Sequence, residues 1–179
     1  MRVSRTFTAA ALLTLLPLAA VSARGVGGFS WGEQYFASDL ANVDIALTTS
    51  GIYGYTVTGG GQRYGGFALG LHSDRTSPTL NGGFIGGIAG QEVRVGPATV
   101  AATAWTGFGG MSMDPLAGTT GTFALFGELA LEAGFGFLPG VQVTGYAALQ
   151  GIAQVRPERV SLSSAVYTPV IGLRVAWGS

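Results

Sequence analysis

The side chains of this sequence that could do chemistry stand out as charged residues in an otherwise apolar C-terminal third. Glu128 and Glu132 lie four residues apart, and Tyr146 and Arg174 follow at greater separations. Two carboxylates suggest acid–base catalysis, but four residues of extended chain separate them by about 13 Å, too far for a glycosidase pair. These side chains are therefore better suited to ion pairing and hydrogen bonding than to catalysis.

A second candidate is the run His72-Ser73-Asp74, where three residue types of hydrolytic sites are adjacent. A serine nucleophile needs its general base within hydrogen-bond reach. Neighbouring residues of a strand point to opposite faces, so His72 and Ser73 are not expected to meet. We predict no catalytic residue, and a lipid-modifying enzyme is the alternative function.

Metal and nucleotide chemistry have no support in the sequence. A single His and the absence of Cys leave no ligand set for a transition metal, and we predict no cofactor. The glycine-rich stretch 82–90 lacks the Lys-Ser/Thr pair and the following helix of a phosphate-binding loop. Glycine there is expected to allow tight curvature of a sheet.

The elements that position these side chains are predicted to be long β-strands. Between Thr122 and Trp177 the sequence alternates with a period of two, which indicates strands with one apolar and one more polar face. Earlier segments show the same pattern, and such strands exceed the usual length of about 5–6 residues in soluble sheets. The eight predicted strands cover residues 24–36, 44–57, 62–72, 80–93, 98–110, 122–137, 141–151 and 166–177.

The connections between these strands alternate in length. Short turns are predicted at 59–61, 95–97 and 138–140. Longer loops are predicted at 37–43, 73–79, 111–120 and 156–164. Alternation of short turns with longer loops is typical of an up-and-down barrel in the outer membrane, where the turns face the periplasm. The sequence therefore predicts an all-β, eight-stranded antiparallel transmembrane barrel.

The first 23 residues are predicted to be a cleaved secretory signal peptide. Arg2 and Arg5 form a positive region, residues 7–20 are apolar, and Val21-Ser22-Ala23 supplies a cleavage site. The barrel would then occupy residues 24–179, with seven Arg, no Lys and nine acidic residues. That composition has no basic patch for nucleic acid, and an exported chain without Cys has no disulfides.

Two groups of barrel residues are predicted to have distinct roles. Tyr167 and Trp177 lie ten residues apart in one register of the last strand, which matches the roughly 25 Å between the aromatic girdles of a membrane barrel. Phe135 and Phe137 are assigned to the same girdles. Inside, an eight-stranded barrel is just wide enough for its side chains to fill. The lumenal polar network is predicted to contain Glu128, Glu132, Tyr146, Arg174, Gln142 and Gln150, extended by Gln154.

The predicted register places members of that network opposite one another. If the turn at 138–140 closes a hairpin, Glu132 is expected opposite Thr144 and Glu128 opposite Ala148. A symmetric last hairpin is expected to put Arg174 opposite Tyr146. The network is predicted to fill the lumen, because unpaired charges there would be costly; a gated or narrow conduction path is the alternative.

The pattern as a whole resembles the small outer-membrane barrels of the OmpA-transmembrane-domain and OmpX type. The signal peptide, eight strands, inward polar and outward apolar residues and the aromatic-bearing last strand carry this resemblance across nearly the whole mature chain. It implies outer-membrane lipid as the surroundings, the barrel-assembly machinery as a partner during insertion, and a structural or surface-interaction role. In that family the chain usually ends on an aromatic residue, whereas here Gly178 and Ser179 follow Trp177. A secreted soluble barrel for a small apolar ligand is a third possibility, and the oligomeric state stays open.

Overall fold

A computed structural model describes residues 23–38, 43–73, 79–114, 120–154 and 165–178. The predicted signal peptide lies outside these ranges except for residue 23. Most of the residues predicted as long loops also lie outside them. Among the described residues, no helix has the length and apolar character needed to cross a membrane.

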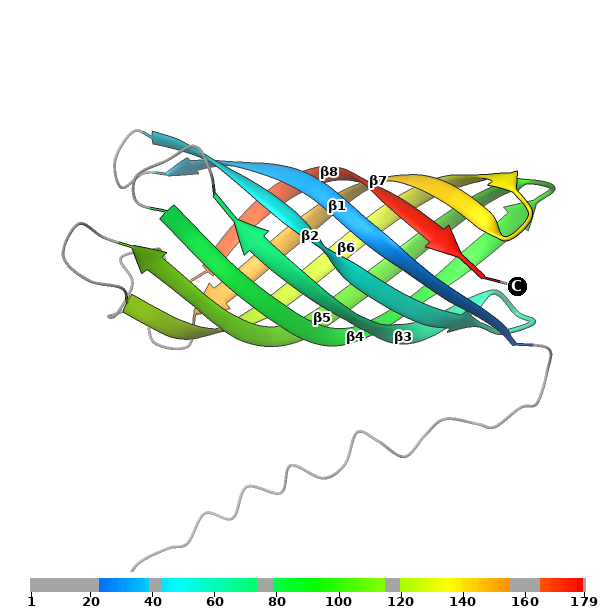
Figure 1. The fold of residues 1–179 in the computed structure, drawn as a ribbon, viewed down its shortest axis with the longest axis horizontal. Coiled ribbons are helices and arrows are strands. Elements are labelled where there is room, and N and C mark those ends of the chain that lie inside the picture. Colours follow the sequence, from blue (N-terminus) through cyan, green and yellow to red (C-terminus); the bar gives the residue numbers. More distant parts are fainter. Residues whose placement is uncertain (1–22, 39–42, 74–78, 115–119, 155–164, 179) are drawn as a thin grey trace, which may run out of the picture.

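The described chain forms a closed antiparallel barrel in which each strand pairs with its neighbours in sequence and β8 returns to β1 (Figure 1). The strands are β1 (Arg24–Ser38), β2 (Val43–Val57), β3 (Gln62–His72), β4 (Thr79–Val95), β5 (Ala98–Asp114), β6 (Thr120–Leu138), β7 (Val141–Gln154) and β8 (Ala165–Trp177). The predicted fold class is confirmed. Several strands extend past their predicted ends, because pairing continues along the walls after the clear alternation of the sequence fades.

The strands are strongly staggered around the barrel. A row of paired residues that starts at Arg24 on β1 passes through every strand and returns to β1 at Gln34, ten positions higher (24 to 34). For eight strands this stagger corresponds to a tilt of roughly 40° from the barrel axis. Each row of side chains therefore climbs as it circles the barrel.

The short turns lie together at one end, here called the turn end (Figure 1). Each uses a glycine with positive φ, at Gly61, Gly96 and Gly140, a backbone conformation that side chains with a Cβ rarely adopt. The other end, called the loop end, is where the strands lead into segments outside the described ranges. The predicted placing of the three short turns at one end is confirmed.

The register of the last two hairpins differs from the predicted one. Glu132 pairs with Tyr146 and Glu128 with Gln150, not with Thr144 and Ala148. The turn predicted at 138–140 already implies this observed register, because Glu132 lies five residues before 137 and Tyr146 five after 141, so the predicted partners were two positions too close to the turn. In the structure Leu138 pairs with Val141 and the register shifts between Gly136 and Leu138. In the final hairpin Arg174 pairs with Thr144, and Tyr146 pairs with Gly172.

The four residues assigned to aromatic girdles all point outward. Tyr167 is 73% exposed at the loop end of β8, and Trp177 is 55% exposed at the turn end. Phe135 and Phe137, near the turn end of β6, are also exposed, and their rings pack edge to face with centroids 5.4 Å apart. This exposed pair contributes to the apolar outer surface of the barrel.

Candidate functional site

The candidate site is the interior of the barrel, and its centre is Arg174 on β8. The guanidinium donates from Nη2 to Oε1 of Glu128 and from Nη1 to Oε1 of Glu132. Its Nε also donates to Oγ of Ser30 over 3.3 Å. Glu128 and Glu132 come from β6, which lies across β7 from β8. The ion pairs therefore tie the last strand to a strand that is not its neighbour.

Two aromatic rings enclose the same guanidinium. The carbon Cζ of Arg174 lies 4.1 Å from the ring centroid of Trp105 and 4.0 Å from that of Tyr146. A cation between two ring faces is stabilised by the quadrupole of each ring, and the planar guanidinium suits this stacking better than an ammonium does. Charge, hydrogen bonds and stacking thus converge on one side chain.

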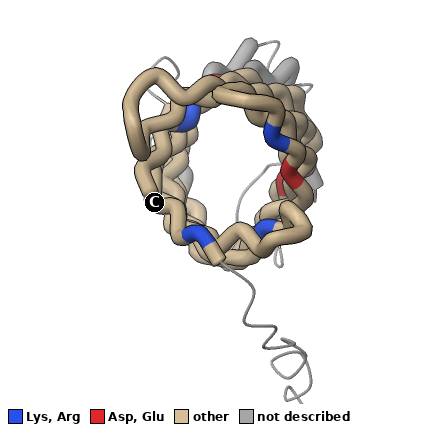
Figure 2. The backbone as a smooth tube through the Cα atoms, turned by 90° about the vertical axis from the view of Figure 1, so that its right-hand side faces the viewer, with Lys and Arg blue, Asp and Glu red and all other residues tan. Residues whose placement is uncertain are grey.

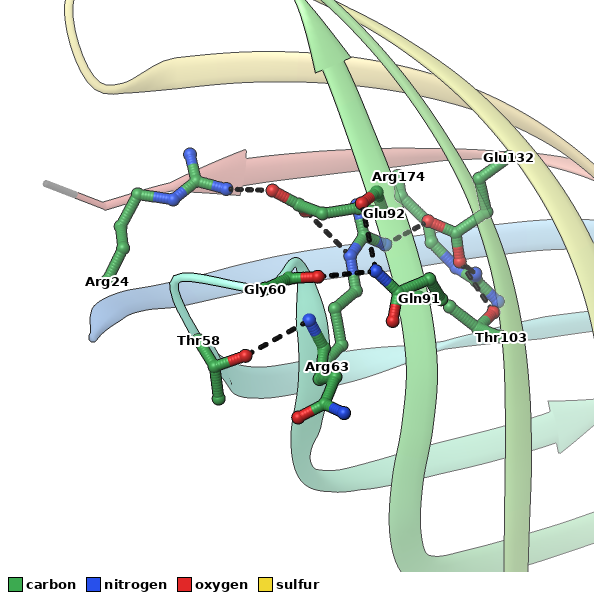
Figure 3. A network of polar contacts seen from close by, with 10 residues as sticks. Arg24, Thr58, Gly60, Arg63, Gln91, Glu92, Thr103, Glu132 and Arg174 are labelled. Carbon is green, nitrogen blue, oxygen red and sulfur yellow. Dashed lines mark hydrogen bonds and ion pairs between the residues drawn. The ribbon is translucent and has the colours of Figure 1, made fainter. Parts of the chain in front are cut away.

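A second arginine extends the network toward the turn end (Figure 3). Arg63 on β3 donates from Nη1 to Oε2 of Glu132 over 2.6 Å and from Nε to Oε2 of Glu92 over 2.8 Å. Its guanidinium also lies 4.7 Å from the ring centroid of Tyr55. Arg24 on β1 completes the chain with a 3.1 Å bond from Nη2 to Oε1 of Glu92. Seen along the barrel from the turn end, charged residues lie around the wall (Figure 2).

We call these six residues the ion-pair network: Arg24, Arg63, Arg174, Glu92, Glu128 and Glu132. Glu132 is its bridge, because it accepts from Arg63 on β3 and from Arg174 on β8. The formal charges of three arginines and three glutamates cancel. All except Arg24 are nearly fully buried. Burying a charge costs several kcal/mol unless a partner compensates it, so each member depends on the others.

A chain of amides continues from the ion-pair network toward the loop end. Gln150 donates to Oε2 of Glu128 over 3.1 Å. Gln34 donates to Oε1 of Gln150 over 2.6 Å and to Oγ1 of Thr49 over 3.0 Å. This chain runs along the β1, β6 and β7 side of the lumen, so that side is polar over most of its length.

Much of the rest of the lumen is filled by rings that come from β2 to β6. We call the cluster of Tyr53, Phe67, Phe84, Trp105 and Phe126 the aromatic core. Neighbouring rings in it have centroids 5.1 to 5.6 Å apart, within the range in which aromatic pairs stabilise one another. Trp105 belongs to both halves, since its ring touches Phe67 and also stacks on Arg174.

Glycines on the inner face make room for these rings. A Cβ built on Gly86 or Gly107 would come within 2.8 and 2.9 Å of the ring of Phe67. A Cβ on Gly172 would come within 2.6 Å of the ring of Tyr146. The glycines that the sequence suggests for curvature therefore also serve as seats for aromatic side chains.

The structure brings together most of the residues predicted for the lumen but not all. Glu128, Glu132, Tyr146, Arg174 and Gln150 face inward and are buried. Gln142 lies nearer the turn end and does not join the ion-pair network. Its Nε2 is buried and has no hydrogen-bond partner among the described residues.

The sequence reasoning missed Arg63, Glu92 and Trp105. The alternation of the strands could have revealed them. Arg63, Phe67, Leu69 and Leu71 occupy alternate positions of β3, and their side chains face the lumen. The large apolar residues on the same face of β3 suggested that this face points outward, so Arg63 was not assigned to the lumen.

In the run His72-Ser73-Asp74, the first two side chains point to opposite faces of β3. His72 is exposed on the outside of β3, where Nδ1 bonds to Oδ1 of Asn81, while Ser73 is buried. Asp74 lies outside the described residues. In the part of the chain that the structure describes, no three His, Cys, Asp or Glu side chains gather in a way that could hold a metal ion.

Eight antiparallel strands with a ten-residue stagger and a filled lumen define the fold of the small outer-membrane barrels. No family model matches the sequence, and no curated protein is found as a relative. Solved structures do match. Neisserial surface protein A is 12% identical, with a TM-score of 0.69 over 87% of this chain and 98% of its own.

The attachment invasion locus protein Ail of Yersinia pestis also has this fold. One structure of Ail is 7% identical, with a TM-score of 0.54 over 88% of this chain and 97% of its own. Another, in complex with the heparin analogue sucrose octasulfate, is 12% identical with a TM-score of 0.50 over 88% and 97%. At these identities the likeness establishes the fold, and the predicted resemblance to small outer-membrane barrels is confirmed at that level.

Proposed function

We propose that this protein is a small barrel of the outer membrane with a closed lumen, which acts as a structural or surface-interaction protein and not as an enzyme or a porin. The observation that carries the proposal is Glu132, held from both sides by Arg63 and Arg174 inside a barrel with an apolar exterior. A lumen crossed by ion pairs and packed with aromatic rings suits a barrel that spans the membrane without conducting ions.

The outer surface supports the membrane location. Leu129, Leu131 and Ile171 are each between 66% and 70% exposed, and further large apolar side chains surround them. Soluble monomers rarely expose apolar patches larger than a few hundred Å². A closed barrel leaves no unpaired strand edge, which is the condition for crossing lipid without helices.

The filled lumen supports the choice against a porin. Wide aqueous channels belong to barrels with about 16–18 strands, whereas an eight-stranded interior is filled by side chains or holds one small ligand. The aromatic core and the ion-pair network occupy the interior here. The predicted lumenal network is retained in this proposal, with Arg63, Glu92 and Arg24 added to it.

The surface-interaction part of the proposal rests on likeness of fold. Ail is described by its name as an attachment and invasion protein, and one structure of it contains a heparin analogue. Fold alone does not transfer such a role, because function resides in sites grafted onto a fold.

The test is fractionation followed by a gel of unboiled and boiled samples. We expect the protein in the outer-membrane fraction, with faster migration before boiling, as folded barrels show. A protein that stays folded and monomeric without detergent would contradict the membrane location. In planar bilayers we expect no stepwise current from the wild type, and steady channel openings would contradict the closed lumen.

A further inference from the structure

The turn end of the barrel opens into a cavity of about 390 Å³. Sites for small molecules commonly have volumes of about 300–1,000 Å³. Residues of β1 and of β4 to β8 line this cavity, and the polar side chains among them include Arg24 on β1, Arg94 on β4 and Gln142 on β7. We call the cavity the turn-end mouth.

Arg94 is a cation without a counter-ion at the turn-end mouth. It follows the buried Glu92 by two residues on β4 and therefore lies on the same inner face. Glu92 already pairs with Arg24 and Arg63, and Arg94 forms no ion pair or hydrogen bond with the described residues. The ion-pair network is neutral, so Arg94 adds an uncompensated positive charge. Basic residues predominate around the rim when the barrel is viewed from the turn end (Figure 2).

Arg24 still has hydrogen-bond donors to offer. Only its Nη2 is engaged among the described residues, by Oε1 of Glu92 over 3.1 Å, and its side chain is 24% exposed. In Figure 3 it contacts the ion-pair network from one side only. A guanidinium has five N–H donors, so Arg24 can bind a further anion without releasing Glu92.

Gln142 contributes a buried donor that has no acceptor. Its Nε2 has no hydrogen-bond partner among the described residues and lies over the backbone of Gly134. Gly134 pairs with Thr99, and Thr99 pairs with Arg94. The amide and the backbone of Arg94 are therefore two strand spacings apart, about 10 Å. An unpaired buried donor is costly, and an acceptor bound in the turn-end mouth would remove that cost.

We propose that the turn-end mouth binds a phosphate monoester group. Such a group has three acceptor oxygens and a charge of about −1.5 to −2 at neutral pH. Its oxygens point in different directions, which matches donors that come from β1, β4 and β7. A carboxylate has two oxygens in one plane and matches a single arginine fork. Arginines around one concave site also raise the local concentration of anions.

The phosphate can belong to a soluble ester or to the headgroup of a lipid. Trp177 and Phe137 line the same cavity and are exposed, so an apolar rim for an acyl chain lies beside the donors. The proposed membrane location places the turn end in the periplasm. The inference rests on that proposed function for the compartment alone, and the experiment below separates the two sources.

Calorimetric titration of the protein in neutral detergent micelles tests the site. We expect glycerol 1-phosphate and inorganic phosphate to bind, and acetate to bind at least about tenfold more weakly. Arg94→Gln is expected to weaken phosphate binding at least about tenfold and Gln142→Leu about threefold, because each removes a hydrogen bond to a charged group. Arg75→Gln is the matched control, since it removes the same charge from the segment between β3 and β4 at the opposite end.

Mixed micelles with phosphatidic acid identify the source of the phosphate, and phosphatidylcholine is the control lipid. Binding of phosphatidic acid that Arg94→Gln removes assigns a lipid headgroup. Binding of glycerol 1-phosphate that phosphatidic acid does not displace assigns a soluble ester.

Three results would overturn the inference: no binding of any of these phosphates, acetate binding as tight as phosphate binding, or equal affinities for Arg94→Gln and Arg75→Gln. Gel mobility before and after boiling shows that each variant is folded. A folded, membrane-inserted protein that binds no phosphate would overturn only this inference, whereas a soluble protein would overturn the proposed function itself.

Discussion

The two walls of this barrel are built in opposite ways. In β6 to β8 the inner face is polar, with Glu128, Gln150 and Arg174, and the outer face carries large apolar side chains such as Leu131 and Ile171. In β2 to β5 the inner face carries most of the aromatic core, with Arg63 and Glu92 toward the turn end, and the outer face has many small and polar residues between large apolar ones such as Ile52 and Val100. The β6–β8 wall has the more polar interior, and the β2–β5 wall has the more apolar one.

This difference shows that two kinds of cohesion hold one closed sheet. The aromatic core is stabilised by burial and ring packing, which depend on area and shape. The ion-pair network depends on completeness, because a buried charge without its partner is costly. Substitutions on the two sides should therefore affect the stability and the ion conductance of the barrel differently. The following variants test this.

The largest effect is expected for Arg174→Ala, which leaves Glu128 and Glu132 without their shared cation. Loss of one partner from a buried ion pair costs about 3–5 kcal/mol. We expect the boiled-form mobility to appear at clearly lower temperature, together with small currents in planar bilayers. If both the unfolding temperature and the conductance are unchanged, the network does not close the lumen.

A comparable loss of stability is expected for Phe67→Ala in the aromatic core, without the currents. Truncating a buried Phe to Ala typically costs about 3–5 kcal/mol. The ion-pair network stays intact in this variant, so the barrier to ions should persist. Urea unfolding in detergent micelles measures the loss, and a conducting Phe67→Ala variant would show that the two walls are not separate in this respect.

A smaller effect is expected for Gly172→Ala, because the new methyl group would come within 2.2 Å of the backbone carbonyl oxygen of Trp31 and within 2.6 Å of the ring of Tyr146. Overpacking in a filled core costs about 1–3 kcal/mol. Gly127→Ala is the control, since a Cβ at that position has nothing within 4 Å. Similar unfolding curves for the two variants would mean that the inner glycines do not seat the rings.

The smallest effect is expected for Gln34→Leu, which removes the donor to Gln150 and Thr49. Leaving a buried acceptor without its hydrogen bond costs about 1–3 kcal/mol. The apolar replacement recovers part of this cost by burial, so we expect a loss near the lower limit in the same urea experiment. A loss as large as that of Arg174→Ala would place the amide chain at the centre of the network.

Alternation in the sequence was enough to predict the eight strands and the grouping of the turns. Alternation defines two faces of a strand but does not tell which face is inside. In β8 the polar face contained Arg174 and the choice was clear. In β3 the face with Phe67 and Leu69 also contains Arg63, and its apolar residues suggested the outside as readily as the inside.

The contacts of the site needed more than strand prediction. The partner of Glu132 follows from counting outward from the turn at 138–140, but the register shift between Gly136 and Leu138 beside that turn has no signal in the residue pattern. The meeting of Arg63 with Glu132 joins residues 69 positions apart on β3 and β6. That contact depends on the stagger of the whole barrel, which is a property of closure and not of a local segment.

Arg174 also sets an order of events. It lies on the last strand, 42 residues after Glu132 and 46 after Glu128, and it reaches back to Ser30 on the first strand. A growing sheet that has added β6 already carries both carboxylates but lacks this counter-charge. Contacts between such distant parts of the chain form late, after the entropy of joining them has been lost. Docking of β8 therefore closes the seam and neutralises the interior in one step, which makes an almost complete barrel much less stable than a complete one.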